Sequence, residues 1–391
     1  MVVGATAAAW SASARETVHD TRYADDFDEL WSTLKARYAF FGEKATDWAQ
    51  VRRRYRPAAL TAADDAHFGE IIQRVLNELY DPHTHLINPP PGSPRWPLYD
   101  LKVELKAGRV HVSAVLEDSA AHRAGVSPGD QIIDVGGVPM PIAMRASAPC
   151  CLRRPDRAAE VYAANAAVAG RRGADRTLTI VGVGGRRTTS LPVLSRPPRP
   201  DLEARRLENG VGLIVIRSFA DLATVDAFDR ALLTLEDAPA LLIDVRDNGG
   251  GDTAVARPII GRFIGERRPY ARMRRRSGEG LGPAWTETVE PRGPFTWTKP
   301  VAVVVGPWSA SMAEGFAMGM RSVREVKLVG GVMMGLGAAV FPLRLNRTGL
   351  QAQYSAEPIY DLQDRPRWLL APDVGVPAGS DALLAAALTV L

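Results

Sequence analysis

The residues with the clearest potential for chemistry lie between Ser309 and Glu314, where the chain reads SASMAE. This segment follows an apolar run from Val301 to Val305 and a Gly-Pro break, and the pattern after it is helical. A serine in the turn between a strand and a helix lies beside unpaired N–H groups and the positive end of the helix dipole, where an oxyanion can be stabilised. The same position also suits a plain helix N-cap. The segment alone therefore leaves two interpretations open, a nucleophile and a cap.

A second turn suited to anion binding lies upstream of this segment. The short apolar stretch from Leu241 to Val245 runs into the sequence RDNGGG, which ends at Gly251, and an apolar helical pattern follows. Glycines tolerate positive φ and leave backbone N–H groups accessible, so such a turn can form the second half of an oxyanion hole. A flexible strand-to-helix turn without a chemical role is the alternative interpretation.

Taken in this order, the two segments resemble those of the C-terminal processing peptidases, also called tail-specific proteases, whose core carries D-x-R-x-N-x-G-G and then S-A-S-x-x-E. The resemblance places the nucleophile at Ser311. It also implies that the backbone N–H groups of Met312 and of the glycine turn, at Gly250, hold the oxyanion. The matching residues are Asp244, Arg246, Asn248, Gly250 and Gly251 in the first motif, and Ser309, Ala310, Ser311 and Glu314 in the second.

Sequence ahead of these motifs extends the resemblance. The stretch from Gly108 to Gly137 is similar to a PDZ domain, with glycines where tight turns are needed, and these proteases carry such a domain before the catalytic core. We expect a PDZ-like domain at residues 97–195, with a helical insertion from Ile142 to Ala174. The loop at residues 95–101 lacks the G-x-G that usually binds a peptide carboxylate. This departure argues against the binding of C-termini.

The usual catalytic base of the family is missing. Relatives carry a lysine in a G-K-G turn, whereas this chain has Leu336 between two glycines, and leucine cannot accept a proton. A tricorn-like branch uses a histidine from an N-terminal segment, and the sequence DPHTHL, from Asp81 to Leu86, occupies that place here. The resemblance therefore implies His83 as the base, with His85 as the alternative, because imidazole with a pKa near ~6.5 can relay a proton at neutral pH. A structural, hydrogen-bonded role is the other interpretation of His83.

The histidine branch also needs a carboxylate to orient the ring. The family's usual E-x-x-G is absent, because the segment at residues 366–370 contains no acid. Glu357 is the nearest replacement by chain position, and an ion pair at a strand end is its alternative role. We expect Glu314 to stabilise the start of its helix rather than to do chemistry. The remaining candidates for the orienting carboxylate are Asp361, Asp364 and Asp81.

The chain is long enough for two or three domains, each with its own core. Helical spacing of apolar residues predicts an N-terminal helical domain at residues 21–88, and Pro-rich linkers bound the PDZ-like domain. From residue 201 to 391 strands and helices alternate, which indicates an α/β core, and the resemblance implies a ClpP/crotonase-like one. The predicted fold class is α+β and multidomain. The Arg-rich stretch at residues 267–297 has little periodicity and is expected to form a loop over the site.

Composition excludes several other classes of protein. The net charge of +4 and the absence of a nucleic-acid motif argue against a nucleic-acid partner, and no apolar run is long enough to span a bilayer. Cys150 and Cys151 are adjacent, so they imply no disulfide framework. Without an H-E-x-x-H or a Cys/His cluster, no metal or other cofactor is expected. Residues 1–20 read as a tail or a signal-peptide remnant, with a cleavage-like sequence from Ala12 to Ala14, and the resemblance favours export to the periplasm or outside the cell.

Three functions remain in competition. The first is a serine endopeptidase that cleaves peptides or proteins through Ser311, with a histidine rather than a lysine as base and a PDZ-like domain that delivers or gates the substrate. The second is a catalytically inactive peptide- or ligand-binding protein on the same fold, which the missing lysine and glutamate favour and the retained Ser311 opposes. The third is a PDZ scaffold for partner C-termini. The sequence names neither the substrate nor the oligomeric state.

Overall fold

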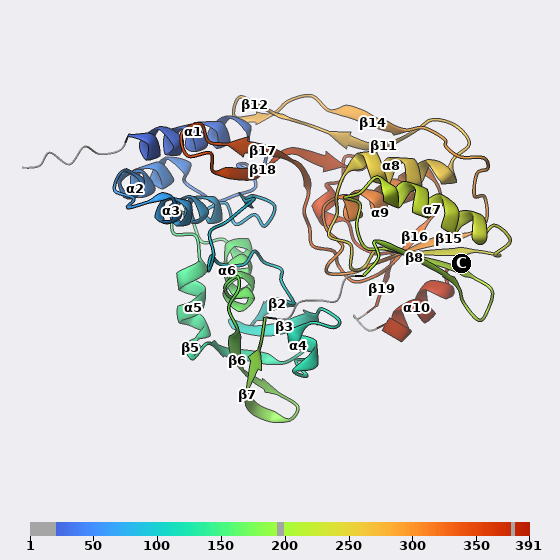
Figure 1. The fold of residues 1–391 in the computed structure, drawn as a ribbon, viewed down its shortest axis with the longest axis horizontal. Coiled ribbons are helices and arrows are strands. Elements are labelled where there is room, and N and C mark those ends of the chain that lie inside the picture. The colour runs from blue at the N-terminus through green and yellow to red at the C-terminus, as the bar shows by residue number, and fades with distance from the viewer. Residues whose placement is uncertain (1–20, 194–198, 377–379) are drawn as a thin grey trace, which may run out of the picture.

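The computed structural model describes residues 21–193, 199–376 and 380–391. In the last of these ranges, side chains are described from residue 382 onward. Figure 1 shows a helical N-terminal unit, a PDZ-like unit below it and an α/β core beside both. This mixture of helices and sheets agrees with the expected fold class. The segment at residues 1–20, interpreted above as a tail or signal-peptide remnant, lies outside the described residues. Within the described ranges, no helix is both long and apolar enough to cross a bilayer.

The N-terminal unit consists of three helices, α1 (Arg22–Arg37), α2 (Trp48–Leu60) and α3 (Asp65–Asn77). Two aspartates cap α2 and α3, since the side chain of Asp47 accepts the N–H of Gln50 and that of Asp64 accepts the N–H of His67. The apolar stripes predicted from the sequence form one buried core. Its largest fully buried members are Phe27, Leu30, Leu34, Tyr38, Phe68, Ile72 and Leu76.

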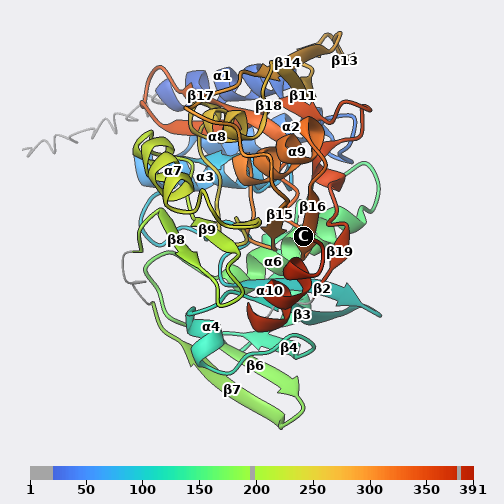
Figure 2. The same cartoon turned by 90° about the vertical axis from the view of Figure 1, so that its right-hand side faces the viewer.

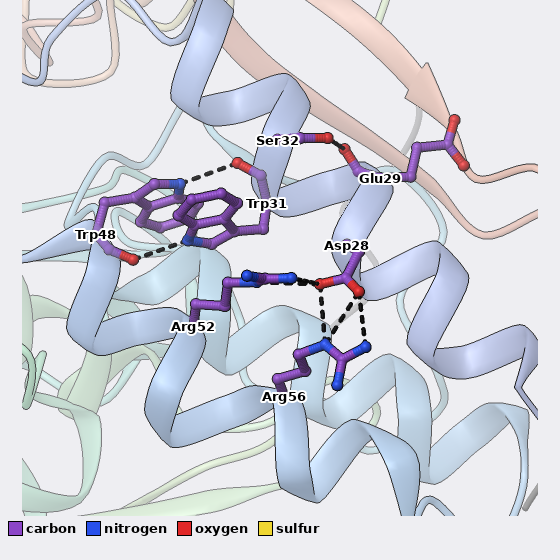
Figure 3. Close-up of polar contacts among 7 residues, drawn as sticks. All are labelled: Asp28, Glu29, Trp31, Ser32, Trp48, Arg52 and Arg56. Carbon is purple, nitrogen blue, oxygen red and sulfur yellow. Dashed lines mark hydrogen bonds and ion pairs between the residues drawn. The ribbon is translucent and has the colours of Figure 1, made fainter.

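Polar contacts join α1 to α2 (Figure 3). The indole N–H of Trp31 donates to the carbonyl of Trp48 at 2.8 Å, and the indole N–H of Trp48 donates to the carbonyl of Trp31 at 3.0 Å. Beside them the Asp28 carboxylate accepts hydrogen bonds from the guanidinium groups of Arg52 and Arg56. These hydrogen bonds and ion pairs connect α1 to α2 at several points along their contact.

The PDZ-like unit is built on a sheet in the order β2-β3-β4-β6-β7, with β5 paired to β4. Figure 2 shows this sheet below the core. Strand β2 is an edge strand of the sheet, and α6 packs along it. The elements are β2 (Leu101–Lys106), β3 (Arg109–Val115), α4 (Ala120–Arg123), β4 (Gln131–Val135), β5 (Val138–Pro139), α5 (Met140–Ser147), α6 (Arg157–Ala169), β6 (Arg176–Gly182) and β7 (Gly185–Leu191).

The core contains a six-stranded sheet in the order β19-β16-β15-β10-β9-β8, which is parallel except for the β8–β9 pair. Helices α7, α8 and α9 pack on one face and α10 on the other, which explains why the central strands are uniformly apolar. The elements are β8 (Leu202–Arg206), β9 (Gly212–Ile216), α7 (Ala223–Thr234), β10 (Leu241–Asp244), α8 (Thr253–Ile260), β15 (Val301–Val305), α9 (Met312–Val323), β16 (Lys327–Gly330), β19 (Val374–Gly375) and α10 (Ser380–Leu388).

A second sheet, in the order β1-β18-β11-β14 with β17 on β18, links the core to the helical unit. The expected loop at residues 267–297 was wrong in part, because β11 and β14 pair as antiparallel strands and bury Tyr270 and Ala271. The pairing partners lie far enough apart along the chain that local periodicity does not reveal them. The elements are β1 (His85–Leu86), β11 (Arg268–Met273), β12 (Arg276–Ser277), β13 (Gly280–Leu281), β14 (Trp285–Val289), β17 (Ala338–Arg344) and β18 (Gln351–Tyr360), with short 3₁₀ turns at Gly261–Phe263 and Arg367–Leu369.

Candidate active site

Ser311 lies in the turn between β15 and α9, directly before the first helical residue, Met312. Its backbone has φ 53° and ψ −113°, a left-handed conformation that residues other than glycine seldom adopt. Such a conformation costs on the order of 1–3 kcal/mol and persists only where neighbouring contacts enforce it. One of these contacts is the hydrogen bond from the Ser311 N–H to the Glu314 carboxylate, at 2.8 Å. The turn therefore holds Ser311 in a strained position at the positive end of α9.

Ser309, the other serine of the motif, is fully buried and has a structural role. Its hydroxyl donates to the carbonyl of Val245 at 2.7 Å and accepts the N–H of Gly306 at 3.0 Å. The side chain thus joins the ends of β10 and β15. With both its donor and its acceptor occupied away from the cavity beside Ser311, Ser309 is poorly suited to act as the nucleophile.

The glycine turn after β10 packs directly against Ser311. Gly250 has φ +104°, and a Cβ placed on it would lie 2.8 Å from the Ser311 Cβ and 3.0 Å from the Met312 nitrogen. No residue with a side chain fits there without moving the serine turn. The N–H of Gly250 donates to the side-chain oxygen of Asn248 at 2.8 Å, so it is already occupied.

Two other N–H groups remain free beside Ser311. Among the described residues, the backbone N–H groups of Met312 and Gly251 have no hydrogen-bond partner, and both residues line the cavity that contains Ser311. Met312 was expected as an oxyanion donor from the sequence. On this geometry the donor from the glycine turn is better assigned to Gly251 than to Gly250, whose role remains a prediction.

The cavity beside Ser311 has a volume of about 610 Å³. Strands β11, β14, β17 and β18 of the second sheet enclose it together with helices α8 and α9. Its apolar wall includes Met312, Met318, Ala338, Val340 and Ile359, and its charged or polar groups include Asp252, Thr253, Arg257, Glu287, Glu357 and Arg367. A space of this size beside a strained serine can hold part of a peptide chain.

Glu314 is almost completely buried, with 1% of its surface exposed, and its carboxylate binds two turns at once. It accepts the N–H of Ser311 and, from a second turn, the N–H groups of Gly335 and Leu336, each at 2.8 Å. Burial raises the pKa of Glu314 to about 7, while the positive charge of Arg367 and the three N–H donors act in the opposite direction. Glu314 therefore stabilises the start of α9, as expected, and it also fixes the turn that contains Gly335 and Leu336.

Leu336 lies in that turn and is buried. Its carbonyl accepts hydrogen bonds from the Arg367 guanidinium, with an Nε–O distance of 3.1 Å. Arg367 is itself buried, and its charge acts on both Glu314 and His83. Arg367 was not predicted from the sequence, because only an acidic residue was expected at residues 366–370. An arginine in a protein does not give up its proton, so Arg367 is not a candidate base.

His83 lies in a turn that Asp81 fixes. One oxygen of the Asp81 carboxylate accepts the N–H of His83 at 3.0 Å, and the other accepts the hydroxyls of Tyr38, Thr84 and Ser355. His83 is 7% exposed, and its Nδ1 has no hydrogen-bond partner. Burial lowers the pKa of His83 to about 4, against the opposing effect of Asp81. The ring is therefore neutral at physiological pH, as a base must be.

The structure does not join His83 to Ser311. Among the described residues no hydrogen bond links the two side chains, and His83 is absent from the residues that line the Ser311 cavity. Strand β18 runs from the His83 turn to the Ser311 cavity. Its residue Ser355 contacts the His83 turn, and Glu357, two residues later, lines the cavity. His85 is less available, because its Nδ1 lies 2.9 Å from the Leu86 carbonyl, its Nε2 lies 3.1 Å from the Gln353 amide, and its ring stacks on Trp96.

Glu357 is buried in the wall of the Ser311 cavity, where it forms an ion pair with Arg275. This pairing matches the alternative role considered for Glu357, and no hydrogen bond to His83 occurs in the described part of the chain. Asp361 and Asp364 are paired with Arg365 and Arg272. Asp81 is therefore the sequence-predicted carboxylate that the structure places beside His83.

The PDZ-like unit contacts both turns that flank Ser311. Trp308 donates its indole N–H to the carbonyl of Tyr99 at 3.0 Å, and the Lys102 ammonium donates to the carbonyl of Val332 at 3.3 Å. Burial lowers the pKa of Lys102, and Glu314 is the first of the charges that oppose this effect. Lys102 thus approaches the active-site region from another domain, which no local motif indicates.

The edge of β2, where a peptide would add as a further strand in a PDZ-like groove, is occupied by a side chain of α6. The Asn165 amide accepts the N–H of Val103 at 2.9 Å and donates to its carbonyl at 3.0 Å. A peptide strand would use these same two backbone groups. The groove is therefore closed at Val103 by the chain's own asparagine.

Comparison with known proteins places three segments of the chain in families. The pattern of peptidase family S41 matches residues 210–376, that of the tricorn protease C1 domain matches residues 19–77, and that of the PDZ domain matches residues 100–148. The carboxy-terminal processing protease CtpB of Bacillus subtilis (strain 168) is 24% identical over 243 residues. That alignment covers 60% of this chain and 46% of the relative, so the match spans about half the length of the curated protein.

Solved structures support the same fold. Mature CPAF superimposes with a TM-score of 0.65 at 14% identity, over 93% of this chain and 94% of the other. The photosystem II D1 C-terminal processing protease superimposes with a TM-score of 0.57 at 17% identity, over 92% and 95% of the two chains. The segment matches and the alignment with CtpB lead to one conclusion: the chain contains a peptidase family S41 segment, with a tricorn protease C1 segment and a PDZ domain ahead of it, and it is homologous to the carboxy-terminal processing protease CtpB.

Proposed function

We propose that this chain is a serine peptidase that cleaves peptide bonds through Ser311. The observation that carries the proposal is the left-handed backbone of Ser311 in the wall of a cavity, beside the free N–H groups of Met312 and Gly251. A strained, cavity-facing serine next to two unpaired donors is the arrangement that acyl transfer requires. A helix cap alone does not need this strain.

In the proposed reaction the Ser311 oxygen attacks the carbonyl carbon of the scissile peptide bond, and its proton passes to a base. The oxyanion that forms is held by the N–H groups of Met312 and Gly251. Return of the proton to the leaving amine gives an acyl-enzyme, and water then releases the acid and regenerates the serine.

We propose His83 as the base. Its ring is neutral at physiological pH, and the unpartnered Nδ1 can accept a proton. Because no hydrogen bond joins His83 to Ser311, the proton transfer requires a rearrangement or a bridging water when substrate binds. Lys102 is the competing candidate, since its amine reaches the turn region beside Glu314 and burial lowers its pKa.

An inactive binding protein on the same fold is the second candidate function. The observation that favours it is the buried Leu336 in the turn where relatives carry the base, together with the separation of His83 from the cavity at Ser311. A peptide held in that cavity would then be bound and not cleaved.

Labelling with a fluorophosphonate separates these functions. We expect the wild-type chain to form one covalent adduct, located by mass spectrometry on the peptide that contains Ser311. Ser311→Ala should abolish the adduct. Ser309→Ala should retain it, although the loss of two buried hydrogen bonds should destabilise the fold by about 1–3 kcal/mol. An adduct that persists in Ser311→Ala would refute the nucleophile, and an unlabelled wild type would favour the binding protein.

Export remains a further proposal. It is supported by the apolar beginning of the chain and by the cleavage-like sequence from Ala12 to Ala14. Cell fractionation with N-terminal sequencing of the recovered protein tests it, and a cytosolic protein that retains Met1 would contradict it.

A further inference from the structure

Two adjacent thiols and a buried carboxylate meet where the helical unit contacts the PDZ-like unit. Glu78 caps the C-terminus of α3, and Cys150 and Cys151 follow α5. The two Sγ atoms lie 3.9 Å apart, and the Cys150 Sγ lies 2.9 Å from Oε1 of Glu78. One ligand atom from each of the three residues falls within 4.8 Å of the others. The candidate active site includes none of these residues.

The Glu78 carboxylate organises the cluster. It accepts the backbone N–H groups of Cys150 and Cys151, at 3.0 and 2.8 Å, and the hydroxyl of Tyr55 at 2.6 Å. Glu78 and Cys151 are buried, whereas Cys150 is exposed. The two thiols are thus fixed side by side, with an opening to solvent at one of them.

The spacing of the sulfurs suits a tetrahedral metal centre. Two thiolates bound to one zinc ion at about 2.3 Å each lie ~3.8 Å apart, and zinc also accepts carboxylate oxygens and water as ligands. The separation of 3.9 Å between the two sulfurs is close to that value. We propose that Cys150, Cys151 and Glu78 bind one thiophilic divalent cation, represented by Zn²⁺, with solvent at the fourth position.

Binding would exchange protons for the metal. The Cys150 thiol now donates to Glu78, and the cation would take the place of that proton between the sulfur and the carboxylate oxygen. Both thiols must ionise, so two protons are released to solvent for each Zn²⁺ bound. Because two protons leave for each Zn²⁺ that binds, the affinity for Zn²⁺ should rise by up to about 100-fold per pH unit below neutrality.

The consequence of binding would be structural, because the cluster lies at a junction of two units. The backbone N–H of Asp47 donates to the carbonyl of Cys151 at 2.7 Å, and the hydroxyl of Thr46 donates to the carbonyl of Glu78 at 2.6 Å. Asp81, which fixes the His83 turn, follows Glu78 by only three residues. A cation held here would clamp the helical unit to the PDZ-like unit next to that turn.

The test is titration of the full chain with Zn²⁺ by isothermal calorimetry, after treatment with a chelator and with a phosphine reductant that does not bind metal. We expect one Zn²⁺ per chain with a Kd in the micromolar range or tighter, and a Tm raised by at least ~2 °C at saturation. Titration with Cd²⁺ should produce a thiolate-to-metal absorption band in the ultraviolet. None of these measurements depends on peptidase activity, so their failure is distinguishable from a failure of the proposed function.

Cys150→Ser is the main variant, because an exposed side chain tolerates the change and the fold can be verified by its Tm without metal. It should weaken Zn²⁺ binding at least 10-fold and abolish the Cd²⁺ band. His67→Ala, at an exposed histidine near the opposite end of α3 from Glu78, is the matched control and should bind as the wild type does. Either a wild type with no Zn²⁺ binding below about 100 μM or a Cys150→Ser variant with unchanged affinity would overturn the proposal.

Discussion

The carboxylate of Glu314 ties Ser311 to the turn that contains Leu336, through N–H···O hydrogen bonds of 2.8 Å to each residue. One buried side chain thus fixes both the candidate nucleophile and the turn that contains Leu336. The backbone of Leu336 holds that turn through hydrogen bonds with Glu314 and Arg367, and the side chain at residue 336 makes neither of them.

Glu314→Gln should loosen both turns. The amide NH₂ of glutamine would face backbone N–H groups where a carboxylate oxygen now accepts them, so at least one buried donor loses its partner. We expect a loss of about 1–3 kcal/mol in the free energy of unfolding and a parallel fall in fluorophosphonate labelling of Ser311. Chemical denaturation and labelling kinetics measure the two effects.

The same variant tests the ionisation of Glu314. The folded state keeps its proton up to about pH 7, whereas an unfolded glutamate releases it near 4.5. The stability that this group contributes is therefore fully present below pH 4.5 and is lost as the pH rises to about 7, by about 3 kcal/mol. The difference in unfolding free energy between wild type and Glu314→Gln should show this slope. Glu160→Gln, at an exposed glutamate, should show none; a flat difference for Glu314→Gln would contradict the raised pKa.

Gly250→Ala should displace the serine turn, because the new Cβ would lie 2.8 Å from the Ser311 Cβ and 3.0 Å from the Met312 nitrogen. A displaced oxyanion donor lowers turnover by roughly 10²-fold or more. Gly249→Ala is the matched control, since a Cβ there has no neighbour within 4 Å. Equal peptidase rates in the two folded variants would show that the close approach of Gly250 to Ser311 has no role in catalysis.

His83→Ala should reduce peptide cleavage by several orders of magnitude if His83 is the base, and His85→Ala should reduce it much less. Because burial lowers the pKa of His83 to about 4, the activity of the free enzyme should fall only as the pH drops toward 4. A free imidazole, with a reference pKa of ~6.5, would give this limb at a higher pH.

Lys102→Met is the comparison that decides between the two candidate bases. It removes the amine near Glu314 and keeps the length of the side chain. If this variant loses activity and His83→Ala retains it, the base is Lys102, and the histidine assignment is wrong. A Tm measurement on both variants excludes unfolding as the cause.

Asn165→Ala should open the edge of β2. The wild-type chain should bind a fluorescent peptide with a free C-terminus weakly, with a Kd above ~100 μM, because Asn165 occupies the backbone groups of Val103. Removal of the amide should tighten peptide binding, as measured by fluorescence anisotropy. It should also lower the free energy of unfolding by about 1–3 kcal/mol. Asn209→Ala, outside the PDZ-like unit, serves as the control. Tight binding by the wild type would show that the groove is open in solution.

The features that could be predicted from the sequence are local ones. Helices α1 and α3 of the N-terminal unit follow from apolar spacing, and the turns at Gly250 and Ser311 follow from motifs of a few residues. The resemblance to tail-specific proteases, the PDZ domain and the mixed helix-and-sheet fold were confirmed by the comparisons. Each of these depends on residues close together along the chain.

The features that were missed depend on contacts between distant residues. Strand β18 pairs with β1 through Leu86 and Ala352, and neither segment carries a signal for the other. In the sequence, Asn165 looks like an ordinary helical residue. Its hydrogen bonds to Val103 exist only because α6 packs on β2. Arg367 and Lys102 approach Glu314 from a different turn and a different domain. A single sequence contains no information on which of these surfaces meet.

Strand β18 sets a limit on how this protein can be divided. Its first half pairs with β1, and Leu345, Ala352, Tyr354 and Ala356 from the β17–β18 hairpin complete the apolar core of the N-terminal helices. A fragment cut at the linker near residue 200 would therefore expose a strand edge and several apolar side chains that the missing helices normally cover, which favours aggregation. The family match covers residues 210–376, but this segment alone is not expected to fold. The smallest fragment expected to fold in isolation also includes the N-terminal helices and β1.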